Sequence, residues 1–248
     1  KEIIMISPLA YVDASAKLGA NVTVHPFAYI DKNVEIGDDC EIMPHVSIMS
    51  GTRMGKRNRI FNGAVIAAEP QDFNYKGDDT IVEIGDDNVI RENVVINRAT
   101  NSGGKTVIGN GNFLHEGVHV SHDTHIGNHS VFGYGSKISG NCMIEDYVIF
   151  GGNVLVSQGC RVGTWSMTQT GCRFRKDVPP YIVAALEPTT YYGVNSVILM
   201  HEGMSEKIVK HISHAYRIIY QGNTSIFDAL LMIKDLSLIH IYEHTRPY

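Results

Sequence analysis

Residues 28–48, AYIDKNVEIGDDCEIMPHVSI, place an aliphatic side chain at every sixth position: Ile30, Ile36, Ile42 and Ile48. An alanine, valine or cysteine stands two positions before each of them. An amphipathic helix repeats at about 3.6 residues and a half-buried strand at about 2, so a period of six requires another geometry. Short strands joined by tight corners supply it. Each hexapeptide then forms one face of a triangular prism, and three hexapeptides form one coil of a parallel β-helix.

The same period covers most of the chain. Aliphatic residues recur at steps of six through residues 12–66, 84–96 and 108–162. Because side chains two apart on a strand share a face, these residues and the small residues before them are expected to point inward. Glycine, asparagine and aspartate gather between them, where corners need unusual backbone angles. The pattern predicts an all-β fold with about ten coils.

Two segments interrupt the period. Residues 67–81, AAEPQDFNYKGDDTI, are polar and contain a proline and a glycine. They predict a long loop, and loops of that length are commonly functional. Residues 98–106, RATNSGGKT, predict a second, shorter excursion from the prism.

Helical signals replace the hexapeptide period after Pro180. Ser205 is placed to cap a helix that ends at Gly222, with Ile208 on its apolar face. A second helix is predicted over residues 225–236.

This organisation predicts two domains. A parallel β-helix should occupy residues 6–186, and a small, truncated α-helical domain should occupy residues 187–236. Its helices should cover the open edge of the last coil, which would otherwise invite aggregation. Residues 237–248, SLIHIYEHTRPY, have no period and are expected to be a non-native tail.

Composition narrows the classes of function. The formal net charge is -5 and the isoelectric point is about 6.2, which argues against a basic nucleic-acid surface. No apolar run reaches the roughly 18 residues that a membrane span needs, and the start of the chain has no secretory signal. We therefore expect a cytoplasmic protein. The four cysteines have no CxxC spacing and are expected to be reduced core residues.

Five histidines lie within residues 114–129, LHEGVHVSHDTHIGNH. They have three explanations. Polar residues are ordinary on the outer face of a β-helix, which suffices for His125 and His129 beside corners. Histidine is also the commonest metal ligand. However, carbonic anhydrases built on such a coil use two histidines five residues apart, and no pair here has that separation. The third explanation is a general base.

The length of one coil favours His122 as that base. One coil beyond His122 stands Gly140, and one coil further stands Gln158, so the three are expected to form a column. An imidazole beside a glycine can take a proton from a hydroxyl while the glycine N–H stabilises an oxyanion. Asp123 can set the tautomer of His122. By spacing alone, a corner glycine remains the simpler explanation of Gly140.

From about residue 6 to residue 236 the chain resembles the UDP-N-acetylglucosamine O-acyltransferases that begin lipid A synthesis in Gram-negative bacteria. The most specific segments are SHDTHIGN, NRIFNGAVIAAEPQDFNYKG, VIREN, DVPPYIVA and YYGVNS. The resemblance implies a left-handed coil and a homotrimer with active sites in the clefts between neighbouring coils. It implies transfer of a 3-hydroxyacyl chain from acyl carrier protein to the sugar 3-hydroxyl, without a cofactor or metal.

The resemblance also assigns residues. It implies that His122 is the base, that Asp123 supports it and that the Gly140 N–H is the oxyanion donor. The positions that it implies for binding the sugar nucleotide are Asp72, Asn74, His119, Asn141, Gln158 and Asn195. Four positions depart from the family pattern. Asn74 stands where a lysine is usual, Asn141 and Ser157 where histidines are usual, and His201-Glu202 where two arginines are usual.

Two further roles concern the acyl donor. Thr170 occupies the position of the acyl-length ruler in the family, where glycine is common, so the chain length stays open. Acyl carrier protein is acidic and needs a basic docking patch. Arg173, Arg175 and Lys176 form a compact basic cluster, for which a solvated face is an equally good explanation.

Three other functions remain open. The N-acyltransferase of the same pathway also has a β-helix, but its relatives carry a uridine-binding domain before the coil, and here the repeat starts by about Ala10. A metal-dependent enzyme like carbonic anhydrase is the second. A scaffold without catalysis, which would not need His122, is the third.

Overall fold

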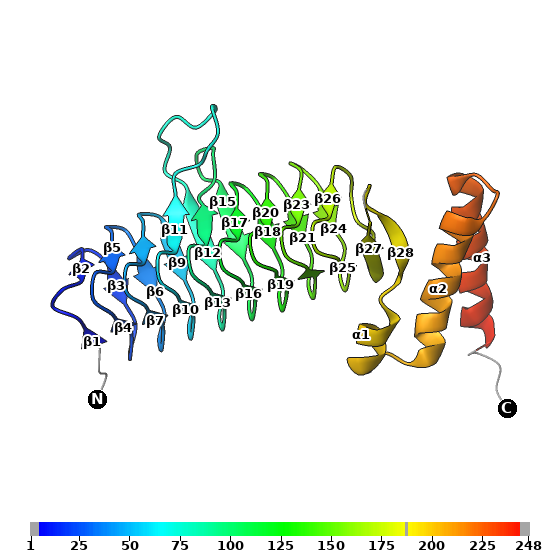
Figure 1. Ribbon diagram of the computed structural model, residues 1–248, viewed down its shortest axis with the longest axis horizontal. Helices are drawn as coiled ribbons and strands as arrows, with labels where there is room; N and C mark the ends of the chain where they lie inside the picture. The colour runs from blue at the N-terminus through cyan, green and yellow to red at the C-terminus, as the bar shows by residue number, and fades with distance from the viewer. Residues whose placement is uncertain (1–4, 187, 244–248) are drawn as a thin grey trace.

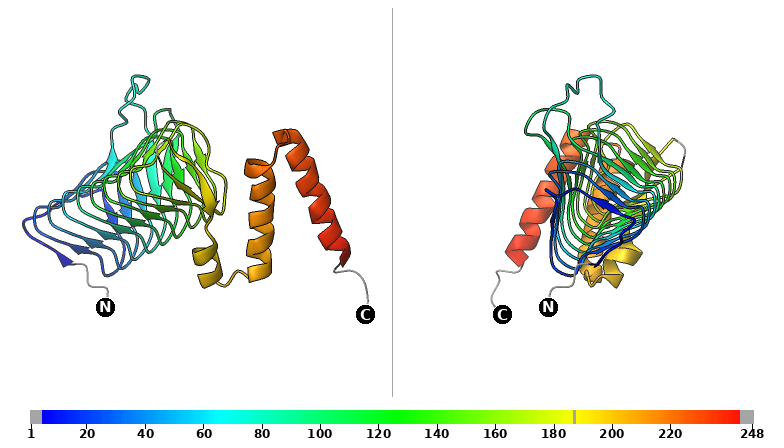
Figure 2. Two further views of the ribbon diagram at one scale, coloured as in Figure 1. Left: turned by 45° about the vertical axis from the view of Figure 1, so that its right-hand side comes forward. Right: turned by 90° about the vertical axis from the view of Figure 1, so that its left-hand side faces the viewer.

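In the computed structural model, which describes residues 5–186 and 188–243, the chain winds into a long prism with three sheet faces (Figure 1). The coils stack in register along the prism, as the view along its length shows (Figure 2). From β1 to β26, consecutive strands belong to different faces, and strands three apart in the chain pair with each other; β25 then pairs with β27, and β27 with β28. This is the parallel β-helix that the period of six predicts. The left-handed sense of the coil still rests on the resemblance.

The first face has eleven strands. In order they are β1 (Met5–Ile6), β4 (Thr23–Val24), β7 (Glu41–Ile42), β10 (Arg59–Ile60), β13 (Val89–Ile90), β16 (Phe113–Leu114), β19 (Val131–Phe132), β22 (Ile149–Phe150), β25 (Met167–Thr168), β27 (Ile182–Ala185) and β28 (Thr190–Val194).

The other two faces have nine and eight strands. The second face contains β2 (Tyr11–Val12), β5 (Tyr29–Ile30), β8 (Ser47–Ile48), β11 (Val65–Ala68), β14 (Val95–Asn97), β17 (His119–Val120), β20 (Lys137–Ile138), β23 (Leu155–Val156) and β26 (Arg173–Phe174). The third contains β3 (Lys17–Leu18), β6 (Glu35–Ile36), β9 (Thr52–Met54), β12 (Ile81–Ile84), β15 (Lys105–Ile108), β18 (His125–Ile126), β21 (Met143–Ile144) and β24 (Arg161–Val162).

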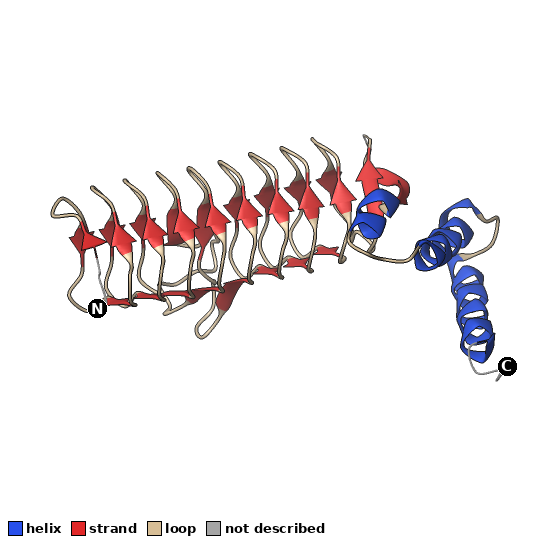
Figure 3. Ribbon diagram, turned by 90° about the horizontal axis from the view of Figure 1, so that it is seen from below, coloured by secondary structure: helices blue, strands red, loops and turns tan. Residues whose placement is uncertain are grey.

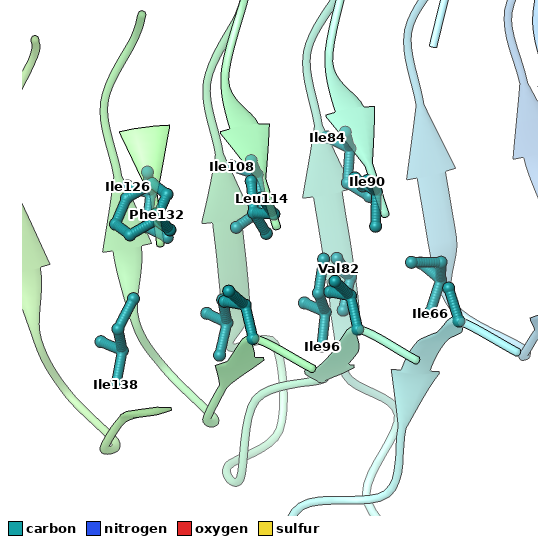
Figure 4. Close-up of a cluster of buried hydrophobic side chains, with 14 of the residues drawn as sticks. Ile66, Val82, Ile84, Ile90, Ile96, Ile108, Leu114, Ile126, Phe132 and Ile138 are labelled. Atoms are coloured by element: carbon teal, nitrogen blue, oxygen red, sulfur yellow. The ribbon is translucent and has the colours of Figure 1, made fainter. Parts of the chain in front are cut away.

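Strand register confirms the length of the coil. Ile30 pairs with Ile48, and Ile126 pairs with Ile144, so partners on neighbouring coils are three hexapeptides apart. The aliphatic residues of the period point into the prism, where Figure 4 shows them stacked. Each such buried side chain contributes about 1.5–3 kcal/mol relative to an exposed one. The four cysteines are free and buried, as predicted.

Asparagine side chains inside the prism satisfy backbone groups at one corner. Asn58, Asn88 and Asn112 are buried on successive coils. The Asn88 N–H donates to Asn58 Oδ1 and the Asn112 N–H donates to Asn88 Oδ1, both at 2.9 Å. Because an unpaired buried N–H is costly, this column stabilises corners that strand pairing does not reach.

Two loops project from the coil where the period is interrupted (Figure 1). The longer one spans residues 69–80 between β11 and β12, and the shorter one spans residues 98–104 between β14 and β15. Both are slightly shorter than predicted, because β11, β12 and β15 extend beyond the hexapeptide pattern and pair with neighbouring strands, with a register shift between Ile66 and Ala68 where β11 pairs with β14.

The C-terminal end differs from the prediction in one respect. The open edge of the last coil is extended by β28, which pairs antiparallel with β27, and helices pack beyond this hairpin (Figure 3). Sequence reasoning did not predict the hairpin, because its residues show no alternation of apolar and polar side chains.

The C-terminal helices are α1 (Ser196–His201), α2 (Glu206–Gln221) and α3 (Ile226–Glu243). The side chain of Ser205 caps α2 by accepting the Ile208 N–H, and the helix ends at Gly222, as predicted. Ile208 itself is half exposed, and Val209 is the buried residue of that turn. α3 continues through residues 237–243, which were predicted to belong to a non-native tail. Residues 244–248 of that segment lie outside the described part of the chain.

Aromatic stacking attaches α2 to the prism. Tyr216 and Tyr220 lie against Tyr191 of β28, with ring centroids 5.7 and 4.6 Å away. The Tyr216 hydroxyl donates to the Pro180 carbonyl at 2.7 Å. Burial raises the pKa of the Tyr216 hydroxyl well above its usual value, so it remains a donor. Among the described helices, none has the length and apolar character to cross a membrane.

Candidate active site

His122 lies at the corner between β17 and β18 and is only 7% exposed. The next residue, Asp123, has a φ of 59°, the left-handed conformation that aspartate adopts more easily than most residues. This turn brings the Asp123 carboxylate against the His122 ring, with Oδ2 2.8 Å from Nδ1. The sequence placed the two residues side by side, and the corner geometry makes them a pair.

Two threonines hold the Asp123 carboxylate and its backbone. The Asp123 N–H donates to Thr106 Oγ1 at 2.9 Å. The Thr100 N–H donates to Asp123 Oδ2 at 3.1 Å. An ionised carboxylate can only accept a hydrogen bond at His122 Nδ1. The hydrogen of neutral His122 therefore belongs on Nδ1, which leaves the lone pair on Nε2.

The long loop brings a second carboxylate to the other ring nitrogen. Asp72 Oδ2 lies 3.4 Å from His122 Nε2. Asp72 Oδ1 accepts the Asn74 N–H at 2.7 Å, so a tight turn fixes the direction of the carboxylate. Asn74, which replaces the usual lysine, therefore contributes its backbone to the site. Its side chain is exposed.

Arg98 anchors the loop that carries Asp72. Its guanidinium donates to the Ala67 carbonyl at 3.1 Å and to the Tyr75 hydroxyl at 2.7 Å. The Tyr75 N–H in turn donates to the Asp72 carbonyl at 3.1 Å. The short loop after β14 thus fixes the long loop after β11, and both reach the corner that holds His122.

Gly140 lies directly against His122, as the predicted column requires. A β-carbon on residue 140 would lie 2.4 Å from His122 Cε1 and 2.6 Å from Nε2. Gly140 is buried, and within the described chain its N–H donates no hydrogen bond. The residue therefore offers a free donor beside the imidazole, although the slot above the ring is narrower than the sequence suggested.

His119 helps to hold the base of the long loop through Asn97. Its Nε2 lies 2.6 Å from Asn97 Oδ1, and Asn97 Nδ2 donates to the Glu69 carbonyl at the base of the long loop at 2.6 Å. Because Asn97 Oδ1 can only accept, His119 Nε2 carries a hydrogen. Burial lowers the pKa of His119, and the nearby charge of Lys137 lowers it further.

The remaining predicted nucleotide contacts are spread along the prism. Gln158 is exposed at the corner one coil beyond Gly140, and Asn141 is the left-handed corner residue whose N–H donates to the His122 carbonyl. Asn195 is buried at the start of α1 and donates to the Trp165 carbonyl at 3.2 Å. Among these three, only Asn141 contacts His122 within one chain.

The residues assigned to the acyl donor lie nearer the C-terminal end. Thr170 is exposed at the corner between β25 and β26. Arg173, Arg175 and Lys176 line one cavity of about 930 Å³ together with Tyr191 and Tyr220. The basic cluster thus borders a hollow between the last coils and the C-terminal hairpin.

Two other histidines of the stretch lie against aromatic rings. His129 stacks on Tyr147 with ring centroids 5.2 Å apart, and His115 lies against Phe113 at 4.7 Å. In the described part of the chain, no group of three or more histidine, cysteine or acidic residues is arranged to hold a metal ion.

Thr100 is the site residue that sequence reasoning missed. It is 3% exposed, and its Oγ1 lies 2.9 Å from His122 Nδ1. The interruption of the period at residues 98–106 marks a loop, but nothing in the sequence indicates which of its side chains reaches the corner.

Two family models match parts of the chain. Residues 105–140 match the bacterial transferase hexapeptide model, which has six repeats, and residues 177–245 match domain 2 of UDP-N-acetylglucosamine O-acyltransferase. The prism of hexapeptide coils and these two matches define the chain as a hexapeptide-repeat acyltransferase.

Relatives that span most of the chain specify the family. The structure of the UDP-N-acetylglucosamine acyltransferase of Bacteroides fragilis 9343 has 51% identity and a TM-score of 0.92, over 93% of this chain and 91% of that chain. The Francisella novicida acyltransferase has 37% identity and a TM-score of 0.91, over 94% and 86%. The acyl-[acyl-carrier-protein]–UDP-N-acetylglucosamine O-acyltransferase of Synechocystis sp. strain PCC 6803 is 38% identical over 185 residues, 75% of this chain and 67% of the relative. The chain belongs to the UDP-N-acetylglucosamine O-acyltransferase family.

Proposed function

We propose that His122 is the general base in the transfer of a 3-hydroxyacyl chain from acyl carrier protein to the 3-hydroxyl of UDP-N-acetylglucosamine. The observation that carries this proposal is the contact of Asp123 Oδ2 with His122 Nδ1 at 2.8 Å, from which we infer that the hydrogen of neutral His122 lies on Nδ1. Asp123 holds Nδ1, so the lone pair on Nε2 faces Asp72 and Gly140. Family membership supports the reaction, because the chain is an acyltransferase of the family that carries out the first step of lipid A biosynthesis.

The reaction follows from these positions. His122 Nε2 takes the proton of the sugar hydroxyl as its oxygen attacks the thioester carbonyl. The free Gly140 N–H stabilises the negative charge of the tetrahedral intermediate. When the carbon–sulfur bond breaks, protonated His122 returns the proton to the departing thiol. Asp123 stabilises the imidazolium between the two steps. All atoms are accounted for without a cofactor.

We assign Asp72 to the binding of the acceptor sugar. Its carboxylate lies beside the nitrogen that must meet the sugar hydroxyl, and carboxylates accept hydrogen bonds from sugar hydroxyls. We assign His119, Asn141, Gln158 and Asn195 to the nucleotide on the basis of the family resemblance.

We further propose that the enzyme is a homotrimer whose active sites are completed by neighbouring subunits. The side chain of Phe73, next to Asp72, is fully exposed at the tip of the long loop, which suits a contact with another subunit. Size-exclusion chromatography with light scattering tests this assembly. A monomer at assay concentrations would contradict it.

Arg173, Arg175 and Lys176 are proposed to dock acyl carrier protein. They border the cavity near Thr170, the proposed acyl ruler, and opposite charges mainly accelerate encounter. Raising the salt concentration should therefore raise KM for the acyl carrier protein more than KM for the sugar nucleotide.

The proposed activity is tested by supplying the enzyme with 3-hydroxyacyl carrier proteins of several chain lengths and with UDP-N-acetylglucosamine or its 3-amino analogue. We expect an ester product with UDP-N-acetylglucosamine. An amide as the sole product would favour N-acyl transfer, and no product with any donor would contradict the proposal. Carbon dioxide hydration that requires added zinc would favour the metal enzyme.

A further inference from the structure

Thr100 belongs to the loop after β14, which departs from the hexapeptide period, and yet its side chain is almost completely buried. Residues 101–103 of the loop are exposed, whereas Thr100 at its base lies against the corner of the next coil. The hydrogen bond from the Gly104 N–H to the Asn101 carbonyl at 2.8 Å closes the loop. A buried hydroxyl on a polar loop needs a partner, and the partner of Thr100 is the proposed base.

Thr100 contacts both members of the histidine–aspartate pair. Its Oγ1 lies 2.9 Å from His122 Nδ1, and its backbone N–H donates to Asp123 Oδ2 at 3.1 Å. Asp123 Oδ2 lies 2.8 Å from the same Nδ1. The Nδ1 position thus has two oxygen partners at nearly equal distance, one charged and one neutral.

These two partners have different consequences for the tautomer. A hydroxyl can donate to Nδ1 or accept from it, whereas an ionised carboxylate can only accept. If Thr100 donated, the hydrogen would lie on Nε2, and His122 could not take a proton from a substrate. The Thr100 backbone N–H donates to Asp123 Oδ2, so Thr100 holds in place the carboxylate oxygen that accepts from Nδ1. The Thr100 Oγ1 then accepts from the same Nδ1–H.

We propose that Thr100 is a positioning residue for the base: its hydroxyl is a second acceptor for the His122 Nδ1–H and stabilises the imidazolium that forms during acyl transfer. The inference rests on the proposed role of His122. The charged groups that face the ring are Asp123 at Nδ1 and Asp72 at Nε2. Asp123 accepts from the same Nδ1–H, so loss of the Thr100 hydroxyl removes one of its two acceptors.

The test compares Thr100→Val, Thr100→Ser and the wild type in acyl transfer. Valine keeps the shape and the backbone N–H but removes the hydroxyl, and serine keeps the hydroxyl. We expect Thr100→Val to lower kcat roughly tenfold, the effect of losing one hydrogen bond to an ionisable group, with little change in KM for the sugar nucleotide. Because the imidazolium loses an acceptor, the acidic limb of the pH profile of kcat should move to lower pH. Thr100→Ser should restore both.

Thr168→Val is the matched control. Thr168 is fully buried in β25, and its hydroxyl has no hydrogen-bond partner in the described chain. The Thr168→Val variant should have the kcat and the pH profile of the wild type. If Thr100→Val does not fold, Thr100→Ala takes its place, because alanine also keeps the backbone N–H and loses the hydroxyl.

The outcomes separate this inference from the proposed function. Wild-type kcat and pH profile in Thr100→Val, together with inactive His122→Ala, would overturn the role of Thr100 and leave the base intact. An equal loss of activity in Thr100→Val and Thr100→Ser, without a shifted pH profile, would show that the residue only orders the loop and would also overturn the inference. Active His122→Ala would overturn the proposed function itself.

Discussion

His122 and Gly140 lie one coil apart, and the imidazole of His122 occupies the space that a β-carbon on residue 140 would need. The position of the ring therefore depends on a glycine that follows it by one coil. The same glycine presents an unpaired N–H to the space beside the ring. Base and donor are thus positioned by the stacking of two coils.

Gly140→Ala should displace the base without unfolding the protein. The new β-carbon would lie 2.4 Å from His122 Cε1, and the ring can move aside at less cost than the backbone. Misplacing a catalytic group by about 1 Å commonly costs roughly a hundredfold in rate, so we expect a fall in kcat of that order. Steady-state kinetics measure it. Gly193→Ala, where a β-carbon meets no atom within 4 Å, is the control and should retain activity. Normal kcat in Gly140→Ala would contradict the placement of the ring.

His119 should make stability depend on pH. Burial lowers the pKa of His119 in the folded state below its ordinary value of 6.5. As the pH falls below 6.5, His119 is therefore protonated in the unfolded chain before it is protonated in the folded protein. This contribution to stability is present above that value and is lost as the pH falls through the lowered pKa of the folded state. His119→Gln can still donate to Asn97 and removes the effect. Thermal melts should show a smaller loss of Tm on acidification in the variant than in the wild type. Above about pH 7.5 both proteins should respond alike, because His119 is then mostly neutral in either state. An equal loss of Tm on acidification in His119→Gln and the wild type would contradict this role of His119.

Thr168→Val should stabilise the protein. Thr168 Oγ1 is buried and has no hydrogen-bond partner among the described residues, so the wild type carries an uncompensated polar group. Replacing it with an apolar group of the same shape should raise the free energy of unfolding by about 1 kcal/mol. Denaturant unfolding measures the change.

The matched comparison is Thr124→Val. That hydroxyl is equally buried but donates to the Ser139 carbonyl at 2.9 Å and accepts the Cys142 N–H at 3.3 Å. Its loss should destabilise the protein by about 1–3 kcal/mol. Equal effects of the two substitutions would contradict the assignment of partners.

The period of six allowed much of the fold to be predicted. The period gives the coil length and identifies the residues that point inward. Because three hexapeptides of equal length make one coil, the inward residues of neighbouring coils can align in only one register. The period also gives the approach of Gly140 to His122, since residues one coil apart must stack. The hairpin of β27 and β28 lies beyond the last hexapeptide, where no periodic constraint applies.

The loop contributions to the site could not be predicted in the same way. Asp72 and Thr100 lie in segments that interrupt the period, so the coil length says nothing about where their side chains point. Their positions depend on long-range hydrogen bonds such as Arg98 to Tyr75 and Asn97 to the Glu69 carbonyl. Only the resemblance pointed to Asp72, and nothing in the sequence pointed to Thr100.

The most direct test of the central claim is kcat of His122→Ala with 3-hydroxyacyl carrier protein and UDP-N-acetylglucosamine, measured on protein whose assembly and Tm match the wild type. General-base catalysis typically contributes roughly a hundred- to ten-thousandfold, so we predict a loss of kcat within that range. Activity within about threefold of the wild type, a difference of less than 1 kcal/mol in the barrier, would contradict the assignment of His122 as the base.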